Sequence, residues 1–365
     1  MSKRIVISGG GTGGHVFPAI SIANALKRID NSLNIHFVGA LGKLEMKKVP
    51  EAGYEITGLP VEGFIRKVSV RNITVIIKLL KSLRMAKKII SSFKPDVVVG
   101  VGGYASGPIL KVAGRNGIPT LIQEQNSTPG VTNKLLAKKA KKICVAYQDM
   151  EKYFPAEKIL LTGNPVRKDL ISPDNKRKEA IGYFRLDESL PVILMLGGSG
   201  GSRTINKSVV AGLSKIEKNK VQVIWQTGKN YFEDMQISCR RSGSLMIRLH
   251  DFISRMDLAY AAADIVVSRA GAVTISELSI SGKPVVLIPS PNVAEDHQTK
   301  NAMALVNKDA ALMLRDDESE KKLADLIIEL AHNEEKCRSL SKNISSMAIE
   351  DSDMIIAKEI LKLSE

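Results

Sequence analysis

The chain opens on Lys3-Arg-Ile-Val-Ile-Ser-Gly-Gly-Gly-Thr-Gly-Gly-His15, a short β-branched run that leads at once into a glycine-rich turn. Such a run is typical of a buried parallel strand, and a helical pattern over 18–28 follows the turn. A strand, a glycine turn and a helix in this order begin a doubly wound α/β domain. Glycine lets a backbone approach a phosphate or a sugar closely, and the N–H groups at a helix start favour an anion. This turn is therefore the first candidate binding site.

The same alternation of strand and helix patterns runs through the first half of the chain and then begins again. Each half opens with a strand, a glycine turn and a helix, so the sequence predicts two similar Rossmann-like domains with doubly wound parallel sheets, facing a central cleft. The predicted strands span 3–8, 35–39, 96–101, 120–123 and 142–146, then 191–196, 221–226, 245–249, 264–268 and 284–288; the predicted helices include 18–28, 71–93, 107–116 and 132–140.

The crossing between the two halves is predicted near Thr162-Gly-Asn-Pro-Val-Arg167, because its Asn-Pro pair favours a turn. We expect an N-terminal domain over 1–165 and a C-terminal domain over 166–345. A terminal helix over 346–365 is expected to return to the N-terminal domain.

Three glycine-rich turns follow predicted strands, at 9–14, 100–107 and 197–201. In a parallel sheet, ligands bind at the carboxyl ends of the strands, where these turns lie. No turn is followed by the Gly-Lys-Ser/Thr of a P-loop, and the first one runs on to His15 instead of keeping the dinucleotide spacing. The turns therefore predict a ligand site but favour neither an ATPase nor a dehydrogenase.

Composition narrows the class of protein further. The chain of 365 residues has a net charge of +15, which favours an anionic partner, but aromatic residues make up only 4%, which argues against stacking on nucleic-acid bases. Three scattered cysteines favour a reducing compartment. No apolar run is long enough for a signal peptide or a bilayer span. No metal site is predicted, and Asp351–Asp353 is interpreted as a helix cap.

Seven stretches along the chain resemble one enzyme family, the MurG family of peptidoglycan N-acetylglucosaminyltransferases. The resemblance runs from residue 5 to about residue 305. The stretches are Gly10-Gly-Thr-Gly-Gly-His-Val-Phe-Pro18, Gly102-Gly-Tyr-Ala-Ser-Gly-Pro108, Glu124-Gln-Asn126, Gly163-Asn-Pro-Val-Arg167, Gly197-Gly-Ser199, Ser268-Arg-Ala-Gly-Ala-Val-Thr-Ile-Ser-Glu277 and Glu295-Asp-His-Gln-Thr-Lys-Asn-Ala302.

The resemblance implies a GT-B fold and an inverting transfer of GlcNAc from UDP-GlcNAc to the MurNAc 4-hydroxyl of undecaprenyl-pyrophosphoryl-MurNAc-pentapeptide (lipid I), which yields lipid II. It places lipid I in the first domain and UDP-GlcNAc mainly in the second, with no cofactor. The implied donor-binding residues are Thr12, Gly13, Gly14, Asn126, Arg167 and Ser199, Ile253 through its backbone at the uracil, Glu277 at the ribose and Gln298 at the sugar.

Inverting transfer needs a base at the acceptor hydroxyl and stabilisation of the departing diphosphate. His15 is the first candidate base, because it ends the first turn and titrates near neutrality; the alternative is a helix-start residue bonded to backbone. Glu124 is the second candidate, because its carboxylate could act as the base or hold the acceptor. The alternative is that it only makes hydrogen bonds within its loop. Tyr104 and Ser106 are expected to shape the acceptor pocket. For Glu277, the alternative to binding the ribose is that its carboxylate stabilises the positive end of its helix.

Two departures from the family pattern lie beside the expected donor site. Arg255 stands where an acidic residue is frequent, and Gly200 and Ser202 stand where a bulkier residue and alanine are usual. These changes concern the affinity for the nucleotide and leave the assignment to the family unchanged.

Residues 61–94 combine nine Lys and Arg residues with many apolar ones and a single acidic residue, Glu62. This pattern favours docking on an anionic membrane surface, although an ordinary sheet-covering helix with a solvated lysine face is the alternative. We expect a peripheral protein at the cytoplasmic face of the inner membrane, whose partners include other cell-wall synthesis and division proteins. The basic residues are Arg66, Lys67, Arg71, Lys78, Lys81, Arg84, Lys87, Lys88 and Lys94.

Two other functions remain open at this point. Another GT-B transferase, acting on an acceptor such as diacylglycerol, shares the glycine turns, but the Tyr104 and Glu124 stretches favour lipid I. A non-catalytic nucleotide-sugar or nucleic-acid binding module is suggested by the charge. Against nucleic acid, the basic residues lack interleaved aromatic residues and no nucleic-acid motif is present.

Overall fold

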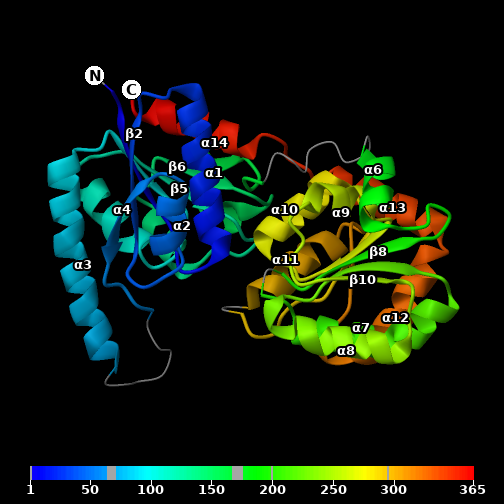
Figure 1. Cartoon of the computed structure of the whole chain (residues 1–365). Helices are drawn as coiled ribbons and strands as arrows, with labels where there is room; N and C mark the ends of the chain where they lie inside the picture. The colour runs from blue at the N-terminus through cyan, green and yellow to red at the C-terminus, as the bar shows by residue number, and fades with distance from the viewer. Residues whose placement is uncertain (1, 64–70, 167–175, 199, 294–295) are drawn as a thin grey trace. The chain divides into compact units, whose positions relative to one another are not determined.

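The computed structural model describes residues 2–63, 71–166, 176–198, 200–293 and 296–365. The chain forms two compact units (Figure 1). Unit 1 contains Met1–Val166 and Ile349–Glu365, and unit 2 contains Arg167–Ala348.

Unit 1 is built on a seven-stranded sheet with the order β3-β2-β1-β4-β5-β6-β7. Every neighbouring pair of strands is parallel. The order reverses between β1 and β4, which makes the carboxyl ends of these strands the natural place for a ligand. The strands are β1 (Arg4–Ser8), β2 (Asn34–Ala40), β3 (Glu55–Leu59), β4 (Val97–Gly100), β5 (Thr120–Glu124), β6 (Lys142–Val145) and β7 (Ile159–Leu161).

Helices pack on this sheet and bury its alternating side chains. Ile5 and Ile7 of β1 share one core with residues of the first helix and of the last helix of the chain, whereas Val6 points to the other face. Figure 1 shows α14, coloured red, beside the blue α1. The helices of unit 1 are α1 (Gly13–Ile29), α2 (Glu45–Glu51), α3 (Arg71–Phe93), α4 (Ser106–Arg115), α5 (Val131–Ala137) and α14 (Ser352–Leu363).

Unit 2 repeats this architecture on a six-stranded parallel sheet with the order β10-β9-β8-β11-β12-β13. Its core contains the single tryptophan, Trp225, which is fully buried and donates its indole N–H to the Asn206 side chain. The strands are β8 (Val192–Leu196), β9 (Gln222–Gln226), β10 (Ile247–His250), β11 (Ile265–Ser268), β12 (Val285–Leu287) and β13 (Leu312–Met313).

The helices of unit 2 follow strands in the βα order, except the first, which precedes β8, and the last, which follows another helix. They are α6 (Arg177–Phe184), α7 (Arg203–Lys218), α8 (Phe232–Ser242), α9 (Met256–Ala262), α10 (Ala272–Ser281), α11 (His297–Val306), α12 (Ser319–Ala331) and α13 (Glu334–Ser345).

The two parallel-sheet α/β domains predicted from the sequence are confirmed, with differences at the margins. Helix α1 begins at Gly13 rather than at residue 18, so Pro18 lies inside the helix and His15 in its first turn. Strands β3, β7 and β13 were not predicted; each is an edge strand, where the hydrophobic pattern is shortest. In the described part of the chain, no helix is long and apolar enough to cross a membrane.

Candidate functional site

The first glycine turn of unit 1 lies backbone to backbone against the turn that follows β4. The Gly10 N–H donates to the Gly102 carbonyl at 3.3 Å. A Cβ on Gly103 would lie 2.3 Å from the Gly10 carbonyl oxygen, so only glycine fits there. Gly11 has φ +91°, a conformation that glycine adopts without strain. The two turns therefore need their glycines in order to touch, and they form one edge of the site.

His15 is half-buried, and its ring is held by the first turn. Its Nδ1 lies 3.1 Å from the Gly10 carbonyl oxygen and 3.3 Å from Thr12 Oγ1. A carbonyl oxygen only accepts hydrogen bonds, so Nδ1 carries the proton. The neutral ring then keeps its lone pair on Nε2, the nitrogen that a general base uses. The hydrogen bond to backbone, which was the alternative interpretation of His15, is thus present. This bond also sets the tautomer that a general base requires.

The three donor residues expected in this turn differ in exposure. Thr12 and Gly14 are exposed, and Gly13 is half-buried in the first residue of α1.

Glu124 ends β5 and is almost fully buried. Its Oε1 accepts the backbone and side-chain N–H groups of Asn126 at 3.0 and 3.2 Å. Its Oε2 accepts the Gly130 N–H at 3.2 Å and the Asn133 side chain at 2.8 Å. Burial raises the pKa of the Glu124 carboxyl above its ordinary value despite these four bonds. The contacts favour loop hydrogen bonding, which orients Asn126, over a role as base.

The two expected acceptor residues differ in exposure. Tyr104 is 60% exposed, and its ring lies against the backbone of Gly63, where a Cβ would come within 2.5 Å of the ring. Ser106 is fully buried, and its hydroxyl donates to the Gly103 carbonyl at 2.8 Å. Ser106 therefore stabilises the second glycine turn, and only Tyr104 presents surface to a ligand.

Unit 2 contains a polar cavity of about 380 Å³ at the carboxyl ends of its strands. Its volume lies within the range of small-molecule sites. Gly197, Gly201 and Ser202 line it from the turn after β8, Arg269 from the end of β11, Ser290 from the loop after β12, and Asp316 from the segment after β13. The N-terminal end of α7 opens on this cavity, and such an end favours an anion.

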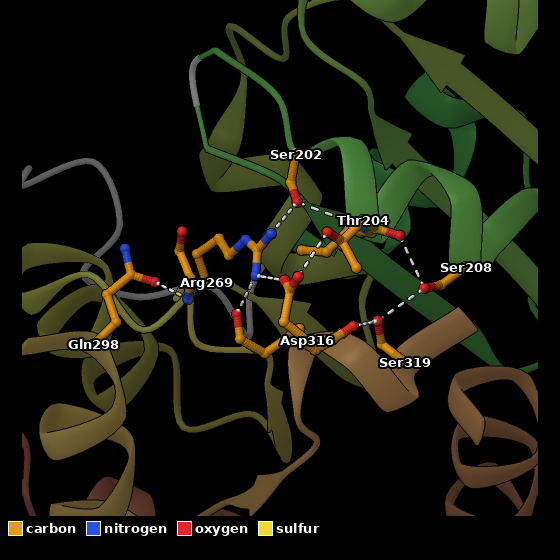
Figure 2. Close-up of polar contacts among 10 residues, drawn as sticks. Ser202, Thr204, Ser208, Arg269, Gln298, Asp316 and Ser319 are labelled. Atoms are coloured by element: carbon orange, nitrogen blue, oxygen red, sulfur yellow. Dashed lines mark hydrogen bonds and ion pairs between the residues drawn. The ribbon is translucent and has the colours of Figure 1, made fainter. Parts of the chain in front are cut away.

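Arg269 joins the loops around this cavity, as Figure 2 shows. One terminal nitrogen, Nη1, donates to the Ile288 carbonyl at 2.9 Å and pairs with Asp316. The other, Nη2, donates to the Ser202 hydroxyl at 2.6 Å. Asp316 also accepts the Thr204 hydroxyl at 2.9 Å. Three strand-end loops are thus tied to one guanidinium.

Ser202, one of the two departures from the family pattern, has two contacts in this network. Besides the bond from Arg269, its hydroxyl accepts the Ile205 N–H at 3.3 Å and so caps α7. An alanine at this position would make neither bond.

The remaining donor residues of unit 2 take different positions. Gln298 lines the cavity and accepts the Ser290 N–H at 2.8 Å (Figure 2). Ile253 is buried, and its N–H donates to Gln226 Oε1 at 2.9 Å. A uracil contacts this N–H only if the Gln226 side chain moves away. Glu277 is half-buried on α10, beyond the first turn. This position weighs against the alternative of stabilising the positive helix end, because that effect falls off within the first turn.

Arg167 and Ser199, expected at the diphosphate, lie outside the described residues. The other departure, Arg255, forms a two-pronged pair with Asp257, with both N–O distances at 2.9 Å, and also reaches Glu179. Together with Lys176, it holds the pKa of Asp257 well below its ordinary range. Arg255 therefore stabilises the junction of α6 and α9 and does not line the cavity.

Sequence reasoning missed three residues of these sites: Arg269, Asp316 and Glu45, whose carboxylate accepts the Gly11 N–H of the first glycine turn. Arg269 lies inside a quoted motif, and its charge at a strand end was the available signal. Asp316 and Glu45 carry no local signal, because only the fold brings them to the glycine turns. Within the described part of the chain, no group of three or more His, Cys, Asp or Glu residues is placed to hold a metal ion.

Comparison with known proteins finds matches over nearly the whole chain. Residues 5–145 match the glycosyltransferase family 28 N-terminal domain, and residues 192–355 match the family 28 C-terminal domain. Two relatives are named UDP-N-acetylglucosamine–N-acetylmuramyl-(pentapeptide) pyrophosphoryl-undecaprenol N-acetylglucosamine transferase. The one from Parabacteroides distasonis is 56% identical over 99% of this chain and 98% of its own length. The one from Phocaeicola vulgatus is 57% identical over 99% and 96%.

A solved structure is similar over the same extent. The crystal structure of Acinetobacter baumannii MurG matches with a TM-score of 0.82 and 28% identity, covering 99% of each chain.

Proposed function

The chain belongs to the N-acetylglucosaminyltransferases of glycosyltransferase family 28 that act on N-acetylmuramyl-(pentapeptide) pyrophosphoryl-undecaprenol, and from this membership we propose that it converts lipid I into lipid II. The observation that carries the proposal is identity above one half along the full length of such relatives. The reaction is the inverting transfer of GlcNAc from UDP-GlcNAc to the MurNAc 4-hydroxyl.

We assign the donor to the cavity of unit 2. The cavity is polar and opens on the start of α7, and the N–H groups there suit a diphosphate. Gln298 lines it and suits the sugar hydroxyls, while Glu277 suits the ribose diol. Ile253 suits the uracil through its backbone. Arg167 and Ser199 are assigned to the diphosphate from the family resemblance alone.

We assign the acceptor to the glycine turns of unit 1, with His15 as the base. The Nε2 nitrogen takes the proton of the MurNAc 4-hydroxyl as its oxygen attacks the anomeric carbon of GlcNAc. The bond from that carbon to the diphosphate breaks, and UDP leaves with the electron pair. The tautomer fixed by the Gly10 carbonyl supports this role. Thr12, Gly13 and Gly14 contact the donor sugar, Tyr104 contacts the acceptor, and Asn126, oriented by Glu124, contacts the donor.

We also propose that helix α3 docks on an anionic bilayer at the cytoplasmic face of the inner membrane. The undecaprenyl chain of the acceptor lies in a bilayer, so the enzyme has to work at its surface. Ile73, Ile76, Ile77 and Leu80 are each about half exposed or more, and their spacing places them on one stripe of the helix. The cysteines are free, which suits a reducing compartment.

A transfer assay with two substrate pairs tests the proposed reaction. The purified chain is incubated with UDP-[¹⁴C]GlcNAc and a short-chain lipid I analogue, and separately with UDP-glucose and diacylglycerol. We expect label only in the product of the first pair. Transfer confined to the second pair would overturn the assignment.

A further inference from the structure

Glu45, the first residue of α2, is a fully buried acidic residue with no role in the proposed reaction so far. Its Oε2 accepts the Gly11 N–H at 2.9 Å, and its Oε1 accepts the Ala40 N–H at 2.8 Å. No ion pair in the described part of the chain includes it. A carboxylate without a cation is costly to bury unless hydrogen bonds compensate, so these two N–H groups hold it in place.

The first glycine turn and the end of β2 are shaped to admit this side chain. A Cβ on Gly10 would lie 1.9 Å from Glu45 Oε1, and a Cβ on Gly39 would lie 2.5 Å from Glu45 Cγ. Both contacts are far shorter than any side chain tolerates. Two glycines, from separate segments, therefore leave room for one carboxylate.

The same peptide group links Glu45 to His15. The peptide between Gly10 and Gly11 donates its N–H to Glu45 Oε2, at 2.9 Å, and its carbonyl oxygen accepts from His15 Nδ1, at 3.1 Å. Hydrogen bonds at the two ends of one amide polarise each other and strengthen together. A negative charge at the N–H end thus makes the carbonyl a better acceptor for the imidazole N–H.

We infer that Glu45 is a positioning residue that acts through the Gly10–Gly11 peptide to fix the His15 tautomer and to raise the basicity of Nε2. No proton moves along this chain: Nδ1 and Gly11 keep theirs, and Glu45 stays ionised. The acceptor hydroxyl proton goes to Nε2, and the resulting imidazolium is stabilised by the carboxylate beyond the peptide. The inference rests on the proposed role of His15 as the base.

Several ionisable groups on the neighbouring elements have partners other than His15. Glu124, at the end of β5, is engaged by Asn126, Gly130 and Asn133. Tyr104 follows β4 and is exposed. On α2, the exposed Glu51 pairs with Lys48, and Arg28, in the last turn of α1, pairs with Asp353 of α14. Glu45, by contrast, is joined to His15 through the hydrogen-bonded Gly10–Gly11 peptide.

Histidine NMR tests the inference without any substrate. Protein labelled with ¹⁵N-histidine is titrated, and a His15→Asn variant identifies the His15 signals. We expect the Nδ1–H tautomer in the wild type and an imidazole pKa lower by about one unit in Glu45→Gln, because an opposite charge favours the protonated ring. An Nε2–H tautomer in the wild type, or the same His15 titration in both proteins, would overturn the inference. The wild-type tautomer needs no variant, so it remains a test if Glu45→Gln does not fold.

Kinetics with the lipid I analogue give the second readout. In Glu45→Gln we expect kcat to fall roughly tenfold with little change in the KM for UDP-GlcNAc, and the acidic limb of the kcat profile to move to lower pH. Glu51→Gln, on the same helix, is the matched control and should behave as wild type. If the acidic limb of the kcat profile of Glu45→Gln stays at the same pH as in the wild type, the inference is contradicted. A wild type without transfer contradicts the proposed function instead, and leaves the NMR result valid.

Discussion

At the residue scale, Arg269 shows how one side chain organises a binding cavity. Its guanidinium presents donors in a fixed planar fork, and three of its bonds end on three different loops. Lysine carries the same charge but concentrates it on one nitrogen. Because the side chain is largely buried beside Asp316, its loss also leaves that carboxylate without its partner.

Replacing Arg269 should therefore weaken donor binding. We expect Arg269→Lys to raise the KM for UDP-GlcNAc about tenfold, on the order of 1.4 kcal/mol, with a smaller effect on kcat. Ser202→Ala removes one of the three bonds and should have a smaller effect in the same direction. Steady-state kinetics with varied UDP-GlcNAc measures both.

The matched control for Arg269→Lys is Arg315→Lys. Arg315 also pairs with an aspartate, Asp317, but it is exposed and does not line the cavity. Equal KM values for Arg269→Lys and the wild type would show that the guanidinium does not organise the donor site.

At the scale of the element, α3 has two apolar faces where a surface helix needs one. Val75, Ala86 and Ile90 are buried toward unit 1, while Ile73, Ile76, Ile77 and Leu80 form an exposed stripe near the start of the helix. Lys81, Arg84, Lys87 and Lys88 follow with exposed charges. The sequence predicted a membrane surface from composition; the structure adds that the exposed apolar residues lie at helical spacing. Phe64, Ile65, Arg66 and Lys67 of the same basic segment lie outside the described residues.

This stripe predicts how vesicle binding depends on single positions. Ile73→Ser combined with Ile77→Ser should reduce flotation with anionic vesicles severalfold at any salt concentration, because apolar burial is lost. Lys81→Glu, Arg84→Glu and Lys88→Glu together should abolish the part of binding that falls as salt rises.

A charge-matched control places three reversals on unit 2, at Lys218, Lys321 and Lys336, all of which are exposed. This variant should float like the wild type. If it loses binding as strongly as the α3 variants, net charge rather than helix α3 accounts for the attraction.

At the scale of the whole molecule, the last helix of the chain belongs to the first unit. Ile356, Ala357 and Ile360 of α14 are fully buried in the core that contains β1 and α1. Asp353, one half of the Asp351–Asp353 pair interpreted as a cap, forms an ion pair with Arg28. Unit 1 is therefore completed only by the end of the chain.

Removing residues 349–365 should destabilise unit 1 by several kcal/mol, because three buried apolar side chains and their partners lose contact. In calorimetry we expect the transition of unit 1 to move down in temperature while that of unit 2 stays. Removal of 364–365 alone is the control and should change neither transition. Equal shifts in both units, or none, would contradict the assignment of α14 to unit 1.

The sequence predicted the central strands, the glycine turns and the architecture, because buried parallel strands carry a continuous hydrophobic signal. It missed the edge strands β3, β7 and β13, which carry little of that signal. Glu124 lies at a strand end, as its motif predicted, but Ser106 and Glu124 are occupied by loop contacts. Glu45, Arg269 and Asp316 act through contacts with distant segments, which no local pattern shows.

The most direct test of the account is the stereochemistry of transfer by the purified chain. UDP-α-GlcNAc and the lipid I analogue are incubated, and the anomeric configuration of the new linkage is determined by NMR. A single displacement with His15 as the base predicts a β-linked GlcNAc-MurNAc product, formed by the wild type and strongly reduced in His15→Ala. An α-linked product, or no transfer to this acceptor by folded protein, would contradict it.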